Sequence, residues 1–267
     1  SAGRTSVIID AGPPATGHAS HNAHASTLAF ELTSGRRPLI VSCGSGAHLG
    51  ADWHRAGRAT PSHSTLCLGG YSSARLGKPI KNAGLFREFL VEAPKIVPVE
   101  MSQTAEGVKF EGAHSGYVPP FGLTHARKLS LSLDGRSLTG EDLLIALNNT
   151  ASANDESVLS SDVNPMVDFQ IRFHLHPEVD AALDLGGTTV AVAAKSGEIW
   201  IFRHESKLSL SIEASVYLEK NQPTPRASRQ IVLSGVVTDA LTRARWSLSK
   251  TQDTAMAIRD LRLEELR

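Results

Sequence analysis

At 267 residues and a formal net charge of zero, the chain can bury a large core and lacks the basic surplus of a nucleic-acid-binding protein. No apolar run reaches the roughly 18 residues of a membrane helix, so we expect no membrane span. No basic-then-apolar export leader is visible at the N-terminus. The two cysteines, Cys43 and Cys67, allow one disulfide at most and do not define a redox compartment.

In the first part of the chain the hydrophobic pattern has a period of two, which is typical of half-buried strands. Ser34 and Gly35 predict a hairpin turn between the second and third of these strands. Pro98 predicts that the last one is an edge or bulged strand, because proline cannot donate to a ladder. The predicted strands here are residues 7–9, 28–32, 39–41, 64–68, 89–91 and 96–101.

The same pattern continues to the end of the chain. Residues 108–111 face residues 129–133, and further strands are predicted at 169–177, 189–192, 198–202, 208–212, 215–218, 230–233 and 245–248. Residues 148–167 read as a long surface loop, and Asp253 caps a short C-terminal helix with Met256, Ile258, Leu261 and Leu266 on its apolar face. Short strands at spacings of roughly 8–12 residues favour a sandwich over a βαβ fold. We therefore expect an all-β fold: one large antiparallel β-sandwich domain over residues 1–267.

Histidines concentrate near the N-terminus, where six of the eleven lie within the first 63 residues. His21 and His24 precede one predicted strand, and His63 precedes another. If those strands are neighbours, His24 and His63 converge and can bind a metal such as zinc, with Ser42 or Cys43 near by. The alternative is that these imidazoles are hydrogen-bonded loop residues.

Two other groups of residues suggest chemistry. His114 lies in a glycine-rich turn near Tyr117, and His125 and Arg127 alternate into the next strand, so this group can serve a carboxylate substrate or belong to a solvated loop. His174 and His176 share one strand face, a spacing that can chelate a metal; we expect instead that both line the solvated side of the strand. Residues 1–92 carry nine Lys and Arg against five Asp and Glu, which suits an acidic ligand or is ordinary charge scatter.

At these residues the sequence resembles the C-terminal β-sandwich of the heparinase II/III-like polysaccharide lyases. The likeness rests on a histidine-containing stretch that enters a strand, residues 24–32, and on the apolar strand at 39–44. It continues at residues 62–70 and 123–135, which resemble the family's His-Asn-Thr and His-x-Arg strands, and extends more loosely to Trp246. The resemblance therefore spans nearly the whole chain.

The resemblance implies a lyase that cleaves acidic, uronate-containing polysaccharide by β-elimination, in the cell envelope or periplasm. In that family a helical toroid supplies a catalytic Tyr and an Asn or His; no helical-period sequence precedes residue 1, so we expect the toroid to be absent from this chain. The sandwich adds a His and, in some members, a structural zinc. The first His of the family's pair corresponds to Asn22, with His21 adjacent. Two of the family's aspartates correspond to Ser26 and Ser42, while His24 and His63 match zinc positions.

The resulting site hypothesis assigns catalysis to His21 and His114, substrate binding to Asn22, His125 and Arg127, and zinc binding to His24 and His63. Two other functions compete with it. The first is a non-catalytic or structural sandwich that binds an acidic glycan through its basic N-terminal face. The second is a degenerate enzyme, which the replacements at residues 22, 26 and 42 suggest.

Overall fold

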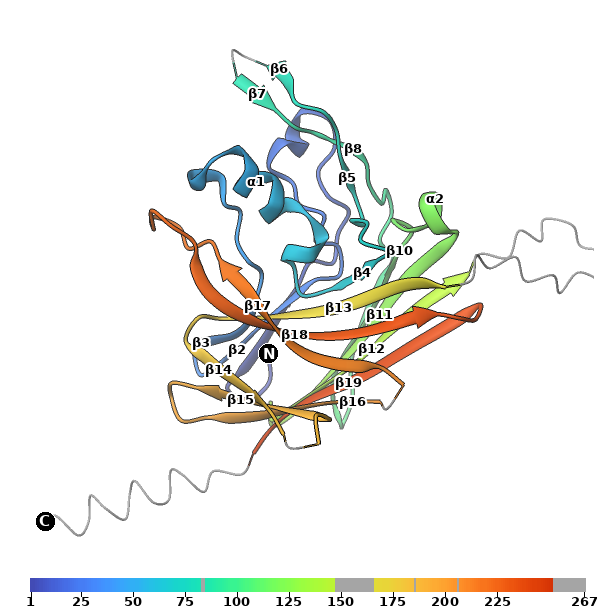
Figure 1. Cartoon of the computed structure of the whole chain (residues 1–267). Helices are drawn as coiled ribbons and strands as arrows, with labels where there is room; N and C mark the ends of the chain where they lie inside the picture. Colours follow the sequence, from blue (N-terminus) through green and yellow to red (C-terminus); the bar gives the residue numbers. More distant parts are fainter. Residues whose placement is uncertain (83–84, 147–165, 185, 206, 252–267) are drawn as a thin grey trace, which may run out of the picture.

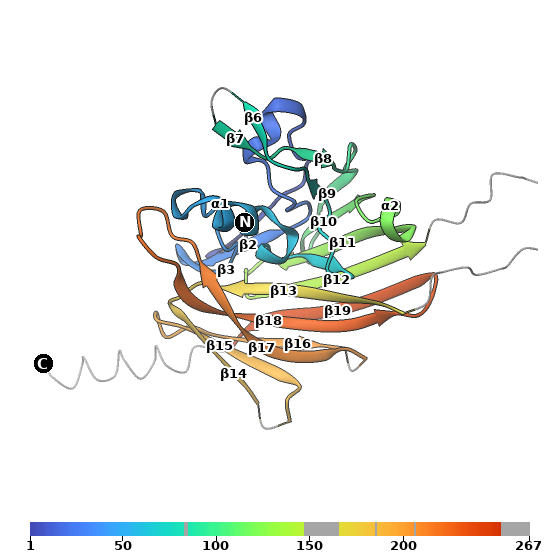
Figure 2. The same cartoon turned by 45° about the horizontal axis from the view of Figure 1, so that its top comes forward.

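Two large antiparallel sheets pack face to face in the computed structural model, which describes residues 1–82, 85–146, 166–184, 186–205 and 207–251 (Figures 1 and 2). The first sheet has the order β1–β2–β3–β13–β18–β17, and β4 also pairs with β13. Its strands are β1 (Thr5–Ile9), β2 (Phe30–Ser34), β3 (Arg37–Val41), β4 (Leu66–Leu68), β13 (Val167–Leu175), β17 (Ser209–Tyr217) and β18 (Arg226–Val237).

The second sheet has the order β14–β15–β16–β19–β12–β11–β10–β9. Its strands are β9 (Val99–Gln103), β10 (Gly107–His114), β11 (Leu123–Ser132), β12 (Ser137–Ala146), β14 (Val179–Leu183), β15 (Thr189–Ala194), β16 (Ile199–His204) and β19 (Leu241–Lys250). The expected all-β sandwich is confirmed, and β9, which follows Pro98, lies at a sheet edge as expected.

Alternating burial explains why these segments form half-buried strands. Along β11 every second side chain is buried, beginning with Leu123 and ending with Leu131. Because successive strand residues point to opposite faces, one face of β11 meets the core and the other meets solvent. Val108 of β10 pairs with Leu131, which confirms the predicted pairing of residues 108–111 with 129–133.

Aromatic side chains from both sheets meet in the core. The ring of Phe30 on β2 stacks on Trp246 of β19, with centroids 5.5 Å apart. Phe173 of β13 lies 4.8 Å from Phe202 of β16 and 4.8 Å from Trp246. All four side chains are buried, and such aromatic pairs stabilise a core beyond the burial of their area. This cluster fixes the two sheets against each other.

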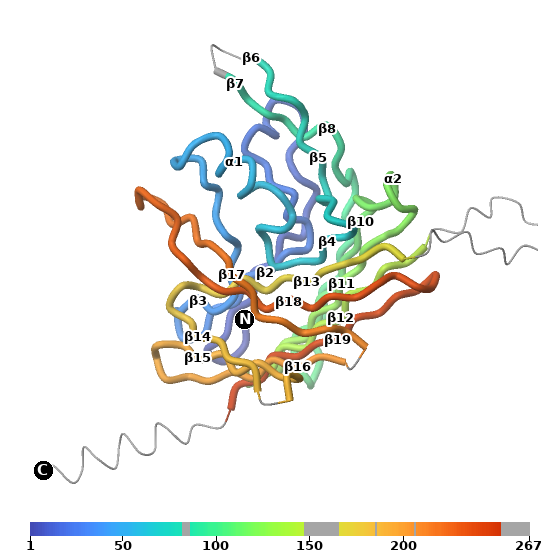
Figure 3. The backbone as a smooth tube through the Cα atoms, in the orientation of Figure 1, coloured from blue at the N-terminus to red at the C-terminus, as the bar shows by residue number. Residues whose placement is uncertain are grey.

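A lobe of short elements stands at one end of the sandwich (Figures 1 and 3). It contains η1 (Gly17–Asn22), η2 (Ala47–Leu49), α1 (Ala51–Arg58), η3 (Thr60–Ser62), β5 (Arg75–Leu76), β6 (Ile80–Asn82), β7 (Leu85–Arg87) and β8 (Leu90–Glu92). A further short helix, α2 (Val118–Phe121), joins β10 to β11.

Arg58 holds this lobe together from the end of α1. Its guanidinium donates to the backbone carbonyls of Ser20, Ala23 and Glu88, at 2.6, 2.8 and 3.0 Å. The side chain is only 1% exposed, so the interactions are shielded from water. Arg58 thereby ties η1 and the residue that follows it to the end of α1 and to the segment before β8.

Some details differ from the sequence-based expectations. His174 does not line a solvated face: it is buried, because its ring packs under the lobe and its Nε2 donates to the Pro61 carbonyl at 2.8 Å. The helix α1 and the strand β12 were not predicted. The predicted C-terminal helix and most of the predicted loop at 148–167 lie outside the described residues. No helix in the described ranges is long and apolar enough to cross a membrane.

Candidate functional site

The imidazoles of His24 and His63 lie side by side where the lobe meets the sandwich. Nδ1 of His24 is 3.2 Å from Nε2 of His63, and the ring centroids are 5.2 Å apart. His24 follows η1 and is half-buried, whereas His63 ends η3 and is 4% exposed. The convergence expected from the sequence is therefore present.

The hydrogen bonding of this pair is compatible with more than one arrangement of the ring protons. The Gly57 carbonyl is a backbone hydrogen-bond partner of both rings and can only accept, so either imidazole can be the donor in the contact between them.

Burial keeps both imidazoles neutral. Loss of hydration, together with the neighbouring His24 and His174, lowers the pKa of His63 to about 3. The pKa of His24 is also lowered, first by burial and then by the charge of Arg58. At neutral pH this pair can donate or accept hydrogen bonds but contributes no positive charge.

The donor set for zinc is incomplete within the described residues. His24 and His63 can each supply one nitrogen, but no group of three or more His, Cys, Asp or Glu side chains there could hold a metal ion. Structural zinc sites have four protein ligands, and catalytic sites have three. The residues present therefore do not by themselves fit a zinc ion.

His21 and Asn22 lie on η1, at the surface of the lobe. Nδ1 of His21 lies 3.0 Å from the His18 carbonyl, which can only accept, so Nδ1 carries the ring proton. The remaining nitrogen, Nε2, then has a lone pair that can accept a proton. Asn22 is exposed. These two predicted residues are accessible to a large ligand.

His114, His125 and Arg127 are instead buried inside the sandwich, at 2%, 0% and 0% exposure. They belong to a chain of hydrogen bonds. The Gly116 N–H donates to Nδ1 of His114 at 3.1 Å, which leaves Nε2 of His114 to donate to Nδ1 of His125 at 3.1 Å. Burial is the main reason that the pKa values of both histidines are lowered.

The series of hydrogen bonds ends on Asp142 of β12, a residue that the sequence analysis does not identify. Nε2 of His125 and Nε of Arg127 both lie 2.8 Å from Oδ1 of Asp142. Because the three predicted residues are enclosed and paired, none of them presents a surface to a polysaccharide in this structure. Their expected roles in catalysis and substrate contact are not compatible with this burial; they form an internal polar network.

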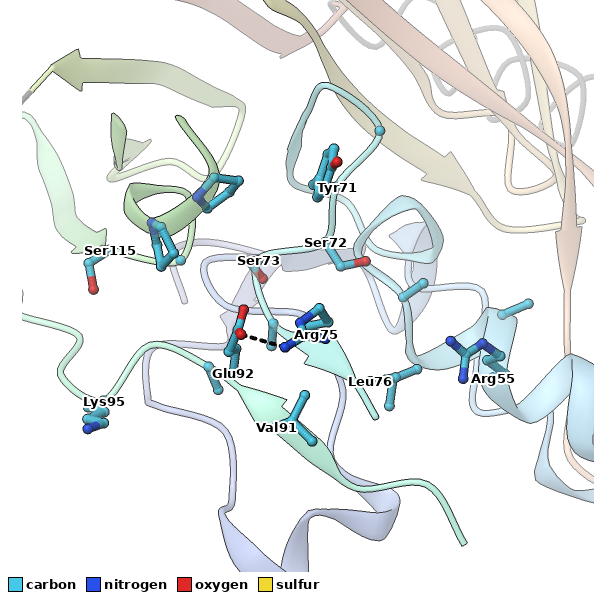
Figure 4. A pocket seen from close by; sticks show the side chains of 18 of the residues that line it. Arg55, Tyr71, Ser72, Ser73, Arg75, Leu76, Val91, Glu92, Lys95 and Ser115 are labelled. Atoms are coloured by element: carbon cyan, nitrogen blue, oxygen red, sulfur yellow. Dashed lines mark hydrogen bonds and ion pairs between the residues drawn. The ribbon is translucent and has the colours of Figure 1, made fainter. Parts of the chain in front are cut away.

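A pocket of about 1310 Å³ opens beside the lobe (Figure 4). Arg55, Arg75 and Lys95 line it together with Asp52 and Glu92, so its charged side chains are three cationic and two acidic. Tyr71, Val91, Ile96, Pro119 and Pro120 supply apolar surface. Such a mixture of cationic groups and flat apolar surface suits an acidic sugar chain.

The pocket is linked to the histidine pair. Ser73, which lines the pocket, donates from its hydroxyl to the Ala25 carbonyl at 3.3 Å, and Thr60 donates to the same carbonyl at 2.6 Å. Ala25 follows His24 directly. The pocket wall is therefore hydrogen-bonded to the residue next to His24.

The cationic side chains of the pocket differ in how far they are neutralised. Arg75 pairs with Glu92 at 2.5 Å, as Figure 4 shows, and Arg55 pairs with Glu88 at 2.5 Å. Lys95 has no ion pair among the described residues. The sequence signalled Arg55 and Arg75 only through the general basic surplus of residues 1–92, and Lys95 lies beyond that range.

Comparison with known proteins decides the family. A family model described as "Heparinase II/III-like, C-terminal" matches residues 1–249. The chain belongs to this family. The C-terminal sandwich expected from the sequence is thus confirmed.

The individual relatives share limited sequence identity with this chain and are much longer than it. The chain is 31% identical over 260 residues to "FtsZ-localized protein C" of Caulobacter vibrioides, covering 94% of this chain and 41% of that protein. The heparan sulfate lyase HepC of Pedobacter heparinus superposes with a TM-score of 0.64 at 15% identity, covering 92% of this chain and 33% of that one. A heparinase III superposes with a TM-score of 0.67 at 12% identity, covering 94% and 33%. The two structural matches establish the fold alone, and the chain spans less than half the length of these relatives.

Proposed function

We propose that this heparinase II/III-like domain binds an acidic, uronate-containing polysaccharide in the pocket beside the lobe and contributes to its cleavage by β-elimination. A helical toroid domain supplies the remainder of the active site. The observation that carries the proposal is the pocket lined by Arg55, Arg75 and the exposed Lys95, whose wall is bonded to Ala25, next to His24. The location that fits this substrate is the cell envelope.

The accessible imidazoles suit the two proton transfers of the reaction. In β-elimination a base accepts the proton from the carbon beside the carboxylate, and its electron pair forms a C=C bond. The glycosidic C–O bond breaks, and the leaving oxygen receives a proton from an acid. Nε2 of His21 has the lone pair of a base, and the half-buried imidazole of His24 would act as the acid when its Nε2 carries the proton. Arg75 and Lys95 would neutralise the uronate carboxylate.

The test measures the absorbance of the unsaturated product with heparan sulfate and alginate. We expect product from the full-length protein, strongly reduced product from His24→Ala, and none from residues 1–267 alone. His204→Ala is the matched control, because His204 is also half-buried but lies on β16 in the second sheet. Activity of residues 1–267 alone would refute the shared active site, and full activity of His24→Ala would remove His24 from it.

Zinc binding by His24 and His63 remains a separate proposal from the family resemblance. Since these two side chains supply at most two ligands, the other ligands would come from residues outside the described set. Metal analysis of protein prepared without chelators tests it: about one equivalent of zinc supports the site, and far less than one equivalent rejects it.

A second candidate is a non-catalytic binding sandwich. The burial of His114, His125 and Arg127, and the serines at positions 26 and 42, favour it. In this case the full-length protein binds acidic glycan without forming product. Binding and product formation are measured on the same samples, so the two candidates are distinguished directly.

A further inference from the structure

One nitrogen of a residue far away in sequence binds both of the loops that carry His24 and His63. NH1 of Arg127 donates to the Leu28 carbonyl at 2.8 Å and to the Ser64 carbonyl at 2.9 Å. Leu28 is four residues after His24, and Ser64 directly follows His63. One nitrogen atom therefore binds the backbone of both histidine-bearing loops.

We propose that Arg127 is a positioning residue that holds the His24 loop and the His63 loop together, so that the two imidazoles stay within hydrogen-bond distance. The inference rests on the proposed function only in treating His24 as a site residue. It assigns to Arg127 a role other than the substrate contact expected from the sequence.

The guanidinium is itself immobilised. Its Nε donates to Asp142, and its carbon lies 5.6 Å from the centre of the Phe30 ring. Asp142 is held in turn by His125 and by Trp246. Since β11, β12 and β19 are adjacent strands of the second sheet, this network fixes the arginine to the frame of the sandwich.

The loops need such an anchor. Leu28 has a φ of +63°, a conformation that costs a non-glycine residue energy and persists only when its surroundings impose it. Its N–H donates to the Asp10 carbonyl at 2.8 Å, and its carbonyl accepts from Arg127, so both of its backbone groups are held. The Ser64 carbonyl also accepts from the Phe30 N–H at 3.3 Å. Besides that weaker contact, the two loops are joined through Ala25, whose N–H donates to the Arg58 carbonyl at 2.8 Å and whose carbonyl accepts from Thr60 at 2.6 Å. Arg127 is what ties Leu28 to Ser64.

If Arg127 only stabilised the fold, its replacement in a folded protein would leave the hydrogen bond between His24 and His63 intact; if it positions the loops, that bond would be lost. We would label the histidine rings of the full chain with ¹⁵N and detect, at neutral pH, the coupling across the hydrogen bond between His24 and His63. Arg127→Lys keeps a charge beside Asp142 but cannot reproduce the fork of the guanidinium. We expect the coupling to disappear in Arg127→Lys, and the Phe30 amide to exchange about tenfold faster relative to the amides of β11.

Arg172→Lys is the matched control. Its guanidinium is mostly buried and bonds to Gln170, Gln230 and Glu213, none of which is on the two histidine loops. This variant should keep the coupling. A folded Arg127→Lys variant with the same coupling and the same relative exchange as the wild type would overturn the proposal.

Two measurements cover the case in which Arg127→Lys does not fold. The double variant Arg127→Met/Asp142→Asn removes both charges, so it leaves no unpaired buried ion, and it should lose the coupling while remaining folded. In the wild type, the Phe30 amide should exchange only with the slowest amides of β11; exchange through a faster local opening would contradict the anchor. Neither readout uses a polysaccharide, so a failure of the lyase assay leaves this inference standing.

Discussion

Trp246 and Asp142 lie 104 positions apart, and Nε1–H of the indole donates to Oδ2 of the carboxylate at 3.0 Å. Both residues are buried. The other oxygen of Asp142 accepts from His125 and Arg127, so each carboxylate oxygen is satisfied. Burial on its own raises the pKa of this carboxyl, but the charge of Arg127 and the hydrogen bond from His125 outweigh it and hold the pKa well below its usual range.

Removal of the charge of Asp142 should therefore be costly. Asp142→Asn leaves the Arg127 guanidinium buried without a counter-ion, and we expect the free energy of unfolding to fall by about 3–5 kcal/mol. Urea denaturation measures this change. Glu213→Gln is the control: Glu213 lies 3.5 Å from Arg172 and its side chain is 41% exposed, so its loss should cost less than about 1 kcal/mol. Equal losses in the two variants would contradict the special position of Asp142.

The pocket should depend on Lys95 for binding acidic glycans. Lys95→Ala is expected to weaken the binding of a heparan sulfate oligosaccharide up to about fivefold at low salt, because an exposed charge contributes at most about 1 kcal/mol. The difference should shrink as salt screens the charge. Lys195→Ala, on the β15–β16 turn, is the control, since Figure 1 places these strands at the other end of the molecule from the lobe. Equal weakening by both substitutions would place binding elsewhere.

The stability of the fold should fall in mild acid through His174. Burial lowers the pKa of His174 to about 4, whereas a histidine in the unfolded chain has a pKa of about 6.5. The unfolded state therefore binds more protons between these values, so this contribution is complete above about pH 6.5 and is lost as the pH falls to about 4. The slope is about 1.4 kcal/mol per pH unit for one imidazole.

His174→Gln should flatten the pH dependence by this amount, as measured by urea denaturation at several pH values. His204→Gln controls for the loss of an imidazole at the surface, where His204 bonds only to the adjacent Glu205 carbonyl among the described residues. An unchanged slope in His174→Gln would show that His174 is protonated within the fold.

The fold could be predicted from sequence because the alternation along each strand is local. The same alternation also predicts that the polar network is buried. His125 and Arg127 are separated by even numbers of residues from Leu123, Leu129 and Leu131, so they point to the same face of the strand, the one that meets the core. The strand predicted from sequence starts at residue 129, so it does not include His125 and Arg127. Once the strand is taken from Leu123, inward burial of both residues follows.

Other features of the site depended on contacts that no local pattern encodes. Asp142 lies on β12, which the sequence reasoning did not identify, and it meets Arg127 only because β12 pairs with β11. His174 has the parity of the half-exposed Gln170 and Arg172, but the lobe covers it. The pocket forms between α1, β5, β8 and the turn before α2, so its composition depends on how the lobe folds over the sandwich.

Gly140 on β12 should tolerate no side chain, because the Trp246 indole occupies the space. A Cβ built at Gly140 would lie 2.1 Å from Cζ2 of Trp246. The indole cannot retreat easily, since it stacks on Phe30 and donates to Asp142. Gly140→Ala should therefore lower the free energy of unfolding by about 1–3 kcal/mol or more.

The matched control is Gly12→Ala. A Cβ at Gly12 meets no atom within 4 Å, and its φ lies outside the left-handed region, so an alanine there should leave stability nearly unchanged or raise it slightly. Urea denaturation of both variants tests the difference. Because Gly140→Ala displaces the indole that holds Asp142, it should also accelerate exchange of the Phe30 amide, as Arg127→Lys does. If Gly140→Ala lowers stability without this local effect, Trp246 fills the core but does not support the arginine anchor.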